Sequence, residues 1–150
     1  MTEPDAESLR ARAIALGNSG GSSDERELEG LLKSPFPAVR RAAASALGKL
    51  IGRASDLRGL LVVPLTAAIE KEERPQVLQY MLKTLRMCAD ELTVLQVDVL
   101  RDIVRNPNLP AYVRDAANEA IAAAQEAEMK RKARLGHWCS RCHRNITEEE

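Results

Sequence analysis

Residues 137–143 contain both histidines, the only tryptophan and two of the three cysteines of the chain. Cys139 and Cys142 have the Cys-x-x-Cys spacing, which lets one tight turn present two thiolates to a single zinc ion. The spacing therefore predicts zinc as a cofactor of this segment. The candidate ligands are Cys139, Cys142, His137 and His143.

This zinc site is incomplete, because a structural zinc takes four ligands and no second Cys or His pair follows before Glu150. Three completions are open: His137 with another ligand, two chains that each donate a pair, or a natural chain that continues into a second knuckle. His143 directly follows Cys142 and would reach the same ion with difficulty. The segment resembles the first half of a treble-clef or ribbon-type zinc finger, which favours truncation or an incomplete site.

The same residues allow other interpretations. Cys139–His143 fits the Cys-x-x-Cys-His pattern of c-type haem attachment, which the absence of an export signal disfavours. A redox dithiol would need a strand and a helix N-terminus around the pair, and the sequence indicates neither. A tail without a ligand, in which the cysteines are incidental, stays open.

Basic residues gather around this segment, and no acid lies between Met129 and Thr147. Such a patch, with a tryptophan to stack on a base, is the basis of the alternative function, nucleic-acid binding. A basic helix end that only complements the helix dipole is the simpler explanation. The residues concerned are Lys130, Arg131, Lys132, Arg134, Trp138, Arg141 and Arg144.

The composition restricts the remainder of the chain. With 150 residues, 22 basic and 22 acidic side chains and a formal net charge of zero, it has room for one domain or a short repeat array and is not basic overall. Aromatic residues are 3% of a chain that is 45% hydrophobic, which favours packed helices over a β-sandwich or barrel. The acidic N-terminus lacks a signal-peptide core, and no window is apolar enough to span a membrane. We therefore expect a cytoplasmic protein without a disulfide framework.

A pattern with a period in the high thirties organises the middle of the chain. Val39, Val77 and Val113 are separated by 38 and 36 residues, and each follows a proline and begins an apolar helical stripe. A helix-like segment precedes each copy, at residues 24–32, 56–71 and 91–105, and Pro64 is expected to kink the second of these. The sequence predicts an all-α fold, a short α–α superhelix of about three helix pairs. Two further sets of apolar residues keep the same repeat spacing: Ala43, Met81 and Ala117, then Leu47, Leu85 and Ile121.

This organisation predicts three parts. Residues 1–23 form an N-terminal helix, over residues 5–16, and a flexible connector over 17–23. Residues 24–136 form the repeat domain, and residues 137–150 form the zinc-binding tail.

The first copy resembles the HEAT repeat, particularly the bacterial lyase HEAT-like subtype, whose second helix reads V-R-x-x-A-x-x-A-L-G. The matching residues are Val39, Arg40, Ala43, Ala46, Leu47 and Gly48. The resemblance covers residues 24–125 and implies a right-handed superhelix that serves as a scaffold for other macromolecules. It also implies that Arg40 and Arg114 bond to the turns between repeats, and that the second helix of each pair lines an inner, concave surface.

Helical spacing identifies the residues of this inner surface. Arg41, Ser45 and Lys49 point away from the core of the first copy, and the repeat offsets transfer that row to the other copies. The row changes from basic to neutral to acidic, which suits a protein partner better than a phosphate backbone. A solvated face without a partner is the plain alternative. The predicted partner-binding residues are Arg41, Lys49, Gln79, Lys83, Asp115 and Glu119.

Catalysis finds no support in the sequence. Both histidines lie in the tail, the connector over residues 17–23 lacks the Gly-Lys-Ser/Thr of a phosphate loop, and Cys88 occupies an apolar helical position typical of a buried residue. A HEAT-like DNA glycosylase would line its cleft with aromatic residues and an acid, and we expect no aromatic residue on the inner surface. The sequence therefore predicts a non-enzymatic scaffold that binds another protein.

Overall fold

The computed structural model describes residues 5–136, and every regular element within them is helical. Short 3₁₀ turns, η1 (Ser22–Asp24), η2 (Ser55–Leu57) and η3 (Ala89–Glu91), precede α2, α4 and α6. The predicted all-α fold is confirmed. The α-helices of this part are α1 (Ala6–Ser19), α2 (Glu25–Leu31), α3 (Pro37–Arg53), α4 (Arg58–Lys71), α5 (Pro75–Arg86), α6 (Val94–Arg105) and α7 (Ala111–Gly136).

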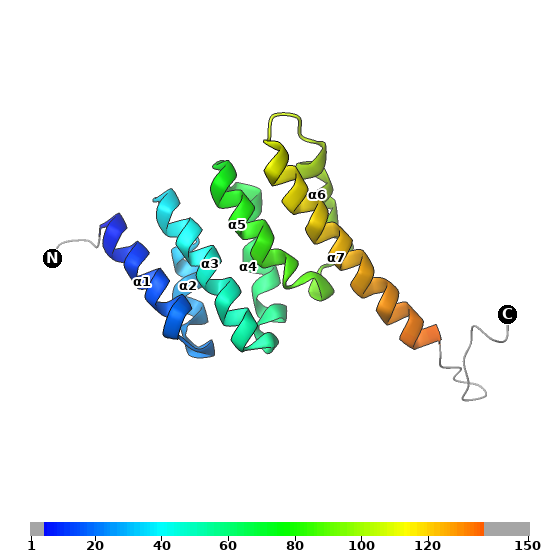
Figure 1. Ribbon diagram of the computed structural model, residues 1–150, viewed down its shortest axis with the longest axis horizontal. Coiled ribbons are helices and arrows are strands. Elements are labelled where there is room, and N and C mark those ends of the chain that lie inside the picture. Colours follow the sequence, from blue (N-terminus) through cyan, green and yellow to red (C-terminus); the bar gives the residue numbers. More distant parts are fainter. Residues whose placement is uncertain (1–4, 137–150) are drawn as a thin grey trace.

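The helices form two layers (Figure 1). In one layer α1, α3, α5 and α7 lie side by side, each packed against the next, and α2, α4 and α6 lie in the layer behind. Within each pair, α2 packs on α3, α4 on α5 and α6 on α7. The described residues therefore form a short α–α superhelix of three helix pairs preceded by one helix, as the period of the sequence predicts. The second half of α7 continues past the end of α6 (Figure 1).

The repeat register is confirmed by the helix starts and by burial. Pro37 and Pro75 occupy the first turns of α3 and α5, and Pro110 directly precedes α7, positions at which a missing N–H costs least. The three apolar residues that define the repeat register in each copy all lie in the core. These buried residues are Val39, Ala43 and Leu47, then Val77, Met81 and Leu85, then Val113, Ala117 and Ile121.

The segments that precede these helices start later than the sequence indicates. α6 begins at Val94, not at residue 91, because Thr93 forms a capping box with Gln96: the Thr93 hydroxyl accepts from the Gln96 N–H at 3.3 Å, and the Gln96 side chain accepts from the Thr93 N–H at 2.8 Å. α4 begins at Arg58, and Pro64 lies inside it without ending it. The helix in the back layer therefore tolerates the proline.

The predicted connector over residues 17–23 differs from the structure in its first part. α1 continues to Ser19, and Gly17 is buried against α3, where a Cβ atom would lie 2.8 Å from the Ala46 Cβ. Arg53 of α3 donates to the carbonyl oxygens of Gly17 and Gly20, both at 2.8 Å. Gly17 thus allows α1 and α3 to approach closely. Composition alone does not distinguish such a glycine from one in a flexible connector.

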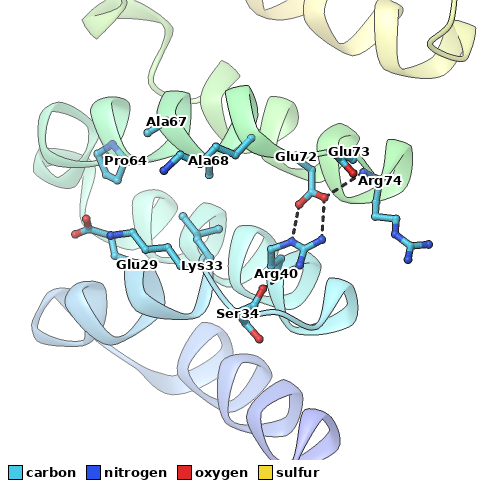
Figure 2. Close-up of a pocket in the computed structure, with 12 residues that line it drawn as sticks. Glu29, Lys33, Ser34, Arg40, Pro64, Ala67, Ala68, Glu72, Glu73 and Arg74 are labelled. Carbon is cyan, nitrogen blue, oxygen red and sulfur yellow. Dashed lines mark hydrogen bonds and ion pairs between the residues drawn. The ribbon is translucent and has the colours of Figure 1, made fainter.

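An ion pair joins the first two helix pairs. Arg40 of α3 binds both carboxylate oxygens of Glu72, at 2.7 and 2.9 Å, and also donates to the Ser34 carbonyl at 2.9 Å, as Figure 2 shows. The Glu72 side chain is 1% exposed and accepts a further bond from the Arg74 N–H. Burial alone would raise the pKa of Glu72, but the hydrogen bonds from Arg40 and Arg74 outweigh it and the pKa is lowered. The pair therefore stabilises the fold above the carboxyl range, and this contribution is lost as the pH falls through the folded-state pKa.

Arg114 occupies the same repeat position on α7 but lacks this environment. Its Nε–H is buried and has no hydrogen-bond partner among residues 5–136. Within that range no helix pair follows α7 to supply an acid, as the turn after α4 does for Arg40. In the middle copy the position is taken by Leu78, which is buried. The expected bond from arginine to the next turn is thus formed by Arg40 and not by Arg114 within the described residues.

The same substitution at both positions tests this difference. We expect Arg40→Leu to lower the free energy of unfolding by about 3–5 kcal/mol, because it leaves the Glu72 carboxylate buried without its partner. Arg114→Leu should change it by less than about 1 kcal/mol, because it removes a buried donor that has no acceptor. Urea unfolding followed by circular dichroism measures both. Equal losses for the two variants would contradict the assignment.

Candidate functional site

We call the exposed side of α1, α3, α5 and α7 the odd-helix face. Arg41 and Lys49 of α3 line a hollow on it together with residues of α1 and α5. Lys83 of α5 lies beside that hollow, and Gln79 is half-buried one turn earlier. Asp115 and Glu119 are exposed on α7. The structure therefore brings Arg41, Lys49 and Lys83 together, whereas the two acids lie on the neighbouring helix.

Tyr80 lies at the centre of the basic part of this face. The residue is 37% exposed, and both the Arg41 guanidinium and the Lys83 ammonium lie 5.7 Å from the centroid of its ring, within the range of a cation–π interaction. Each such contact at an exposed site contributes about 0.5–1 kcal/mol. The ring therefore has two like charges beside it on the surface.

The expectation that no aromatic residue lies on this face is wrong. Tyr80 follows Gln79 by one residue and Tyr112 lies in the first turn of α7, and both line hollows of the odd-helix face. The prediction fails because it followed one row of side chains at four-residue spacing. The exposed side of a helix is wider than one row and includes neighbouring positions.

Two hollows mark the odd-helix face. The first, of about 160 Å³, lies between α1, α3 and α5, and the second, of about 360 Å³, lies between the starts of α3, α5 and α7. Arg41 borders both, and no acidic residue lines either one. The first is lined by Arg10, Ile14, Gly17, Arg41, Ala42, Ser45, Ala46, Lys49 and Tyr80, and the second by Pro37, Ala38, Arg41, Arg74, Pro75, Gln76, Val77 and Tyr112.

A larger groove of about 560 Å³ opens on the other side of the stack, between the turn after α2 and helix α4 (Figure 2). Arg40 reaches from one wall to Glu72 on the other, and Pro64 and Ala68 of α4 line the apolar part. Its charged lining is mixed and includes Glu29 and Lys71. Because Arg40 and Glu72 already neutralise each other, this groove joins repeats and is a weaker candidate for a ligand.

Among residues 5–136, two acidic groups have strongly raised pKa values. The pKa of Glu25 is raised to about 7, first by a hydrogen bond with the Glu29 carboxyl one helical turn later and then by desolvation. The pKa of the Cys88 thiol is raised to about 12, mainly by burial, and the residue is fully buried. The prediction of Cys88 as a small core residue is confirmed. Neither group has the environment of an activated nucleophile.

The predicted zinc ligands Cys139, Cys142, His137 and His143 lie outside the described residues, as do Trp138, Arg141 and Arg144. Within residues 5–136 no group of three or more His, Cys, Asp or Glu side chains is placed to hold a metal ion. Lys130 and Lys132 lie on the exposed end of α7 and pair with Glu126 and Glu128, at 3.2 and 3.4 Å. Arg131 and Arg134 are exposed on the same segment.

Comparison with known proteins supports the repeat. The family model of the HEAT repeat matches residues 26–53, which form most of α2 and all of α3. No curated protein and no solved structure matches the chain. The match covers the first predicted copy, and the stacking of the later pairs extends the same helical architecture. No helix in the described part is long and apolar enough to cross a membrane.

The burial of Cys88 predicts an unreactive thiol. In a Cys139→Ser/Cys142→Ser variant, we expect Cys88 to resist iodoacetamide near pH 8, although the ordinary thiol pKa is about 8.5, and to react fully after unfolding. Mass spectrometry of native and denatured samples measures the modification. Native labelling at the rate of a free cysteine would show that the site opens readily.

Proposed function

We propose that the chain is a non-enzymatic helical-repeat scaffold that binds another protein through its odd-helix face. The observation that carries the proposal is the half-exposed Tyr80 ring between Arg41 and Lys83, because partly exposed aromatic and arginine side chains are typical anchors of protein interfaces. Ile14, Met87 and Tyr112 are also exposed. HEAT repeats in general serve as scaffolds for protein interaction.

The chemistry of the described residues supports binding over catalysis. Residues 5–136 contain no histidine, and their only cysteine is the buried Cys88. A DNA glycosylase site would need aromatic residues and an acid in the same cleft. The two hollows of the odd-helix face are lined by tyrosines but by no acid. The raised pKa of Glu25 arises from its hydrogen bond with the neighbouring Glu29 and from desolvation, and neither requires a catalytic role.

The nucleic-acid alternative has less support among these residues. A phosphate-binding surface needs cations that continue along several repeats. On α7 the odd-helix face instead carries Asp115 and Glu119, and two cations of the basic helix end pair with Glu126 and Glu128. We therefore favour a protein partner.

We also propose that Cys139 and Cys142 bind zinc, with His137 or His143 as a further ligand. The support is the Cys-x-x-Cys spacing. Because two thiolates fill half of a four-ligand shell, a site shared between two chains is one way to complete it.

A site-specific cross-link tests the proposed face. We expect a photoreactive amino acid at Gln76, which lines the second hollow, to capture a discrete partner in cells, and Arg41→Glu with Lys83→Glu to abolish the capture. The same group at Glu70, exposed on α4, is the matched control and should capture nothing. Circular dichroism checks that the variants fold. Unchanged capture in the double variant would contradict the proposal.

Elemental analysis tests the zinc site. Protein purified without added metal should carry between about one zinc per two chains and about one per chain, depending on how the four-ligand shell is completed. Cys139→Ser with Cys142→Ser should remove it. Absence of zinc from the unsubstituted chain, or equal zinc in the variant, would contradict metal binding by this pair.

A further inference from the structure

We propose that the odd-helix face binds an extended acidic segment of the partner, in a groove that runs from Arg10 of α1 past Tyr80 to Tyr112 of α7. This inference rests on the proposed scaffold function and specifies the chemistry of the partner. Three features of the described residues support it: uncompensated charge, an aromatic centre and the continuity of the two hollows.

The charge of this face is one-sided. α3 and α5 contain no acidic residue at all, although both are rich in Lys and Arg. Several of their cations are bound within the fold: Arg40 by Glu72, Arg53 by backbone carbonyls and Arg86 by Glu119. Arg41, Lys49 and Lys83, and Arg10 on α1, form no ion pair with another described residue; Lys49 donates to the neutral Asn18 Oδ1 at 2.8 Å, which leaves its charge without an anion. These four cations surround the first hollow and leave a positive potential that carboxylates would neutralise.

Tyr80 gives this positive surface a fixed centre. Arg41 and Lys83 both lie 5.7 Å from the centroid of its ring, and neither forms an ion pair with a described acid. Carboxylates placed beside the ring would pair with these cations, and the exposed side chains of Ile14 and Tyr80 would cover the methylene groups next to them. An acidic side chain therefore fits this position better than a neutral one.

The two hollows adjoin each other at Arg41, which borders both. Four neighbouring helices at interaxial distances of about 8–10 Å span about 25–30 Å, which an extended segment covers with about eight to ten residues. The second hollow adds Arg74 and the half-exposed Tyr112 at the far end of the groove. A segment of this length would meet cations along most of the groove and a tyrosine in each hollow.

An acidic protein segment matches this distribution more closely than a nucleic acid does. The cations are confined to α1, α3 and α5 and the turn before α5, and the face becomes acidic at Asp115 and Glu119 of α7. Glu119 also neutralises Arg86 at 3.3 Å. A peptide can place its carboxylates over the basic part alone, whereas a continuous phosphate chain would run into the acidic part.

Binding of a defined peptide tests the inference. The probe is a fluorescein-labelled peptide of about ten residues, rich in Asp and Glu with one central Leu, a length taken from the span of the helices. Fluorescence anisotropy with the full chain should show binding that weakens with salt. Arg41→Glu with Lys83→Glu should weaken it by at least about tenfold, and Tyr80→Leu by about two- to fivefold, because the ring that positions the two cations is lost while their charges stay.

Two controls make the result specific. Lys130→Glu with Arg134→Glu changes the net charge by the same amount on the exposed end of α7 and should leave peptide binding unchanged. The Asn/Gln version of the peptide should not bind. Equal loss in the α7 variant, or tighter binding of a single-stranded oligonucleotide of similar length that Arg41→Glu with Lys83→Glu abolishes, would overturn the inference. Absence of peptide binding while the Gln76 cross-link persists would overturn the acidic partner and leave the scaffold function standing.

Discussion

The close approach of the front-layer helices is the constraint on which the rest of the structure depends. Gly17 of α1 lies against Ala46 of α3 with no room for a Cβ atom, and the buried Thr84 hydroxyl of α5 donates to the Ala44 carbonyl of α3 at 2.7 Å. Helices this close exclude large side chains from the space between them. The low aromatic content follows from this packing, and the tyrosines of α5 and α7 are consequently displaced to the exposed side, where Tyr80 and Tyr112 become available for binding.

A second constraint sets the relation between successive pairs. Small residues bring helices together but do not fix the turn of the next pair, and the Arg40–Glu72 pair does so with two bonds across α3 and the end of α4. The middle copy replaces this polar contact with the buried Leu78, and in the last copy the buried Arg114 Nε–H has no partner among the described residues. The repeats therefore share a hydrophobic register and differ in the contacts that join one helix pair to its neighbour. Such a stack has unequal ends, although its core is periodic.

The parts of the fold that depend on local pattern are predictable from the sequence. Apolar spacing and prolines place α3, α5 and α7 and their buried residues, because period and φ restraint act within one helix. The start of α6 requires recognition of the Thr93–Gln96 capping box, and the role of Gly17 requires knowledge of the residue opposite. The partner of Arg40 is 32 residues away and that of Arg86 is 33 residues away, so neither follows from local spacing. The position of Tyr80 beside Arg41 could not be predicted for the same reason, because it depends on how α3 and α5 are rotated relative to each other.

The cations of this chain fall into two groups, although its net charge is zero. Those that the fold uses are compensated by nearby groups, as Arg40 is by Glu72 and Arg53 by two carbonyl oxygens. Arg41 and Lys83, beside Tyr80, form no ion pair with an acid of the described residues, and their mutual repulsion destabilises the folded chain slightly when nothing is bound. An anionic partner removes this repulsion when it binds, and the free energy released adds to that of its own contacts. A neutral partner does not remove it. Neither α3 nor α5 contains an acid, so the balance of the whole chain does not cancel the field over these two helices.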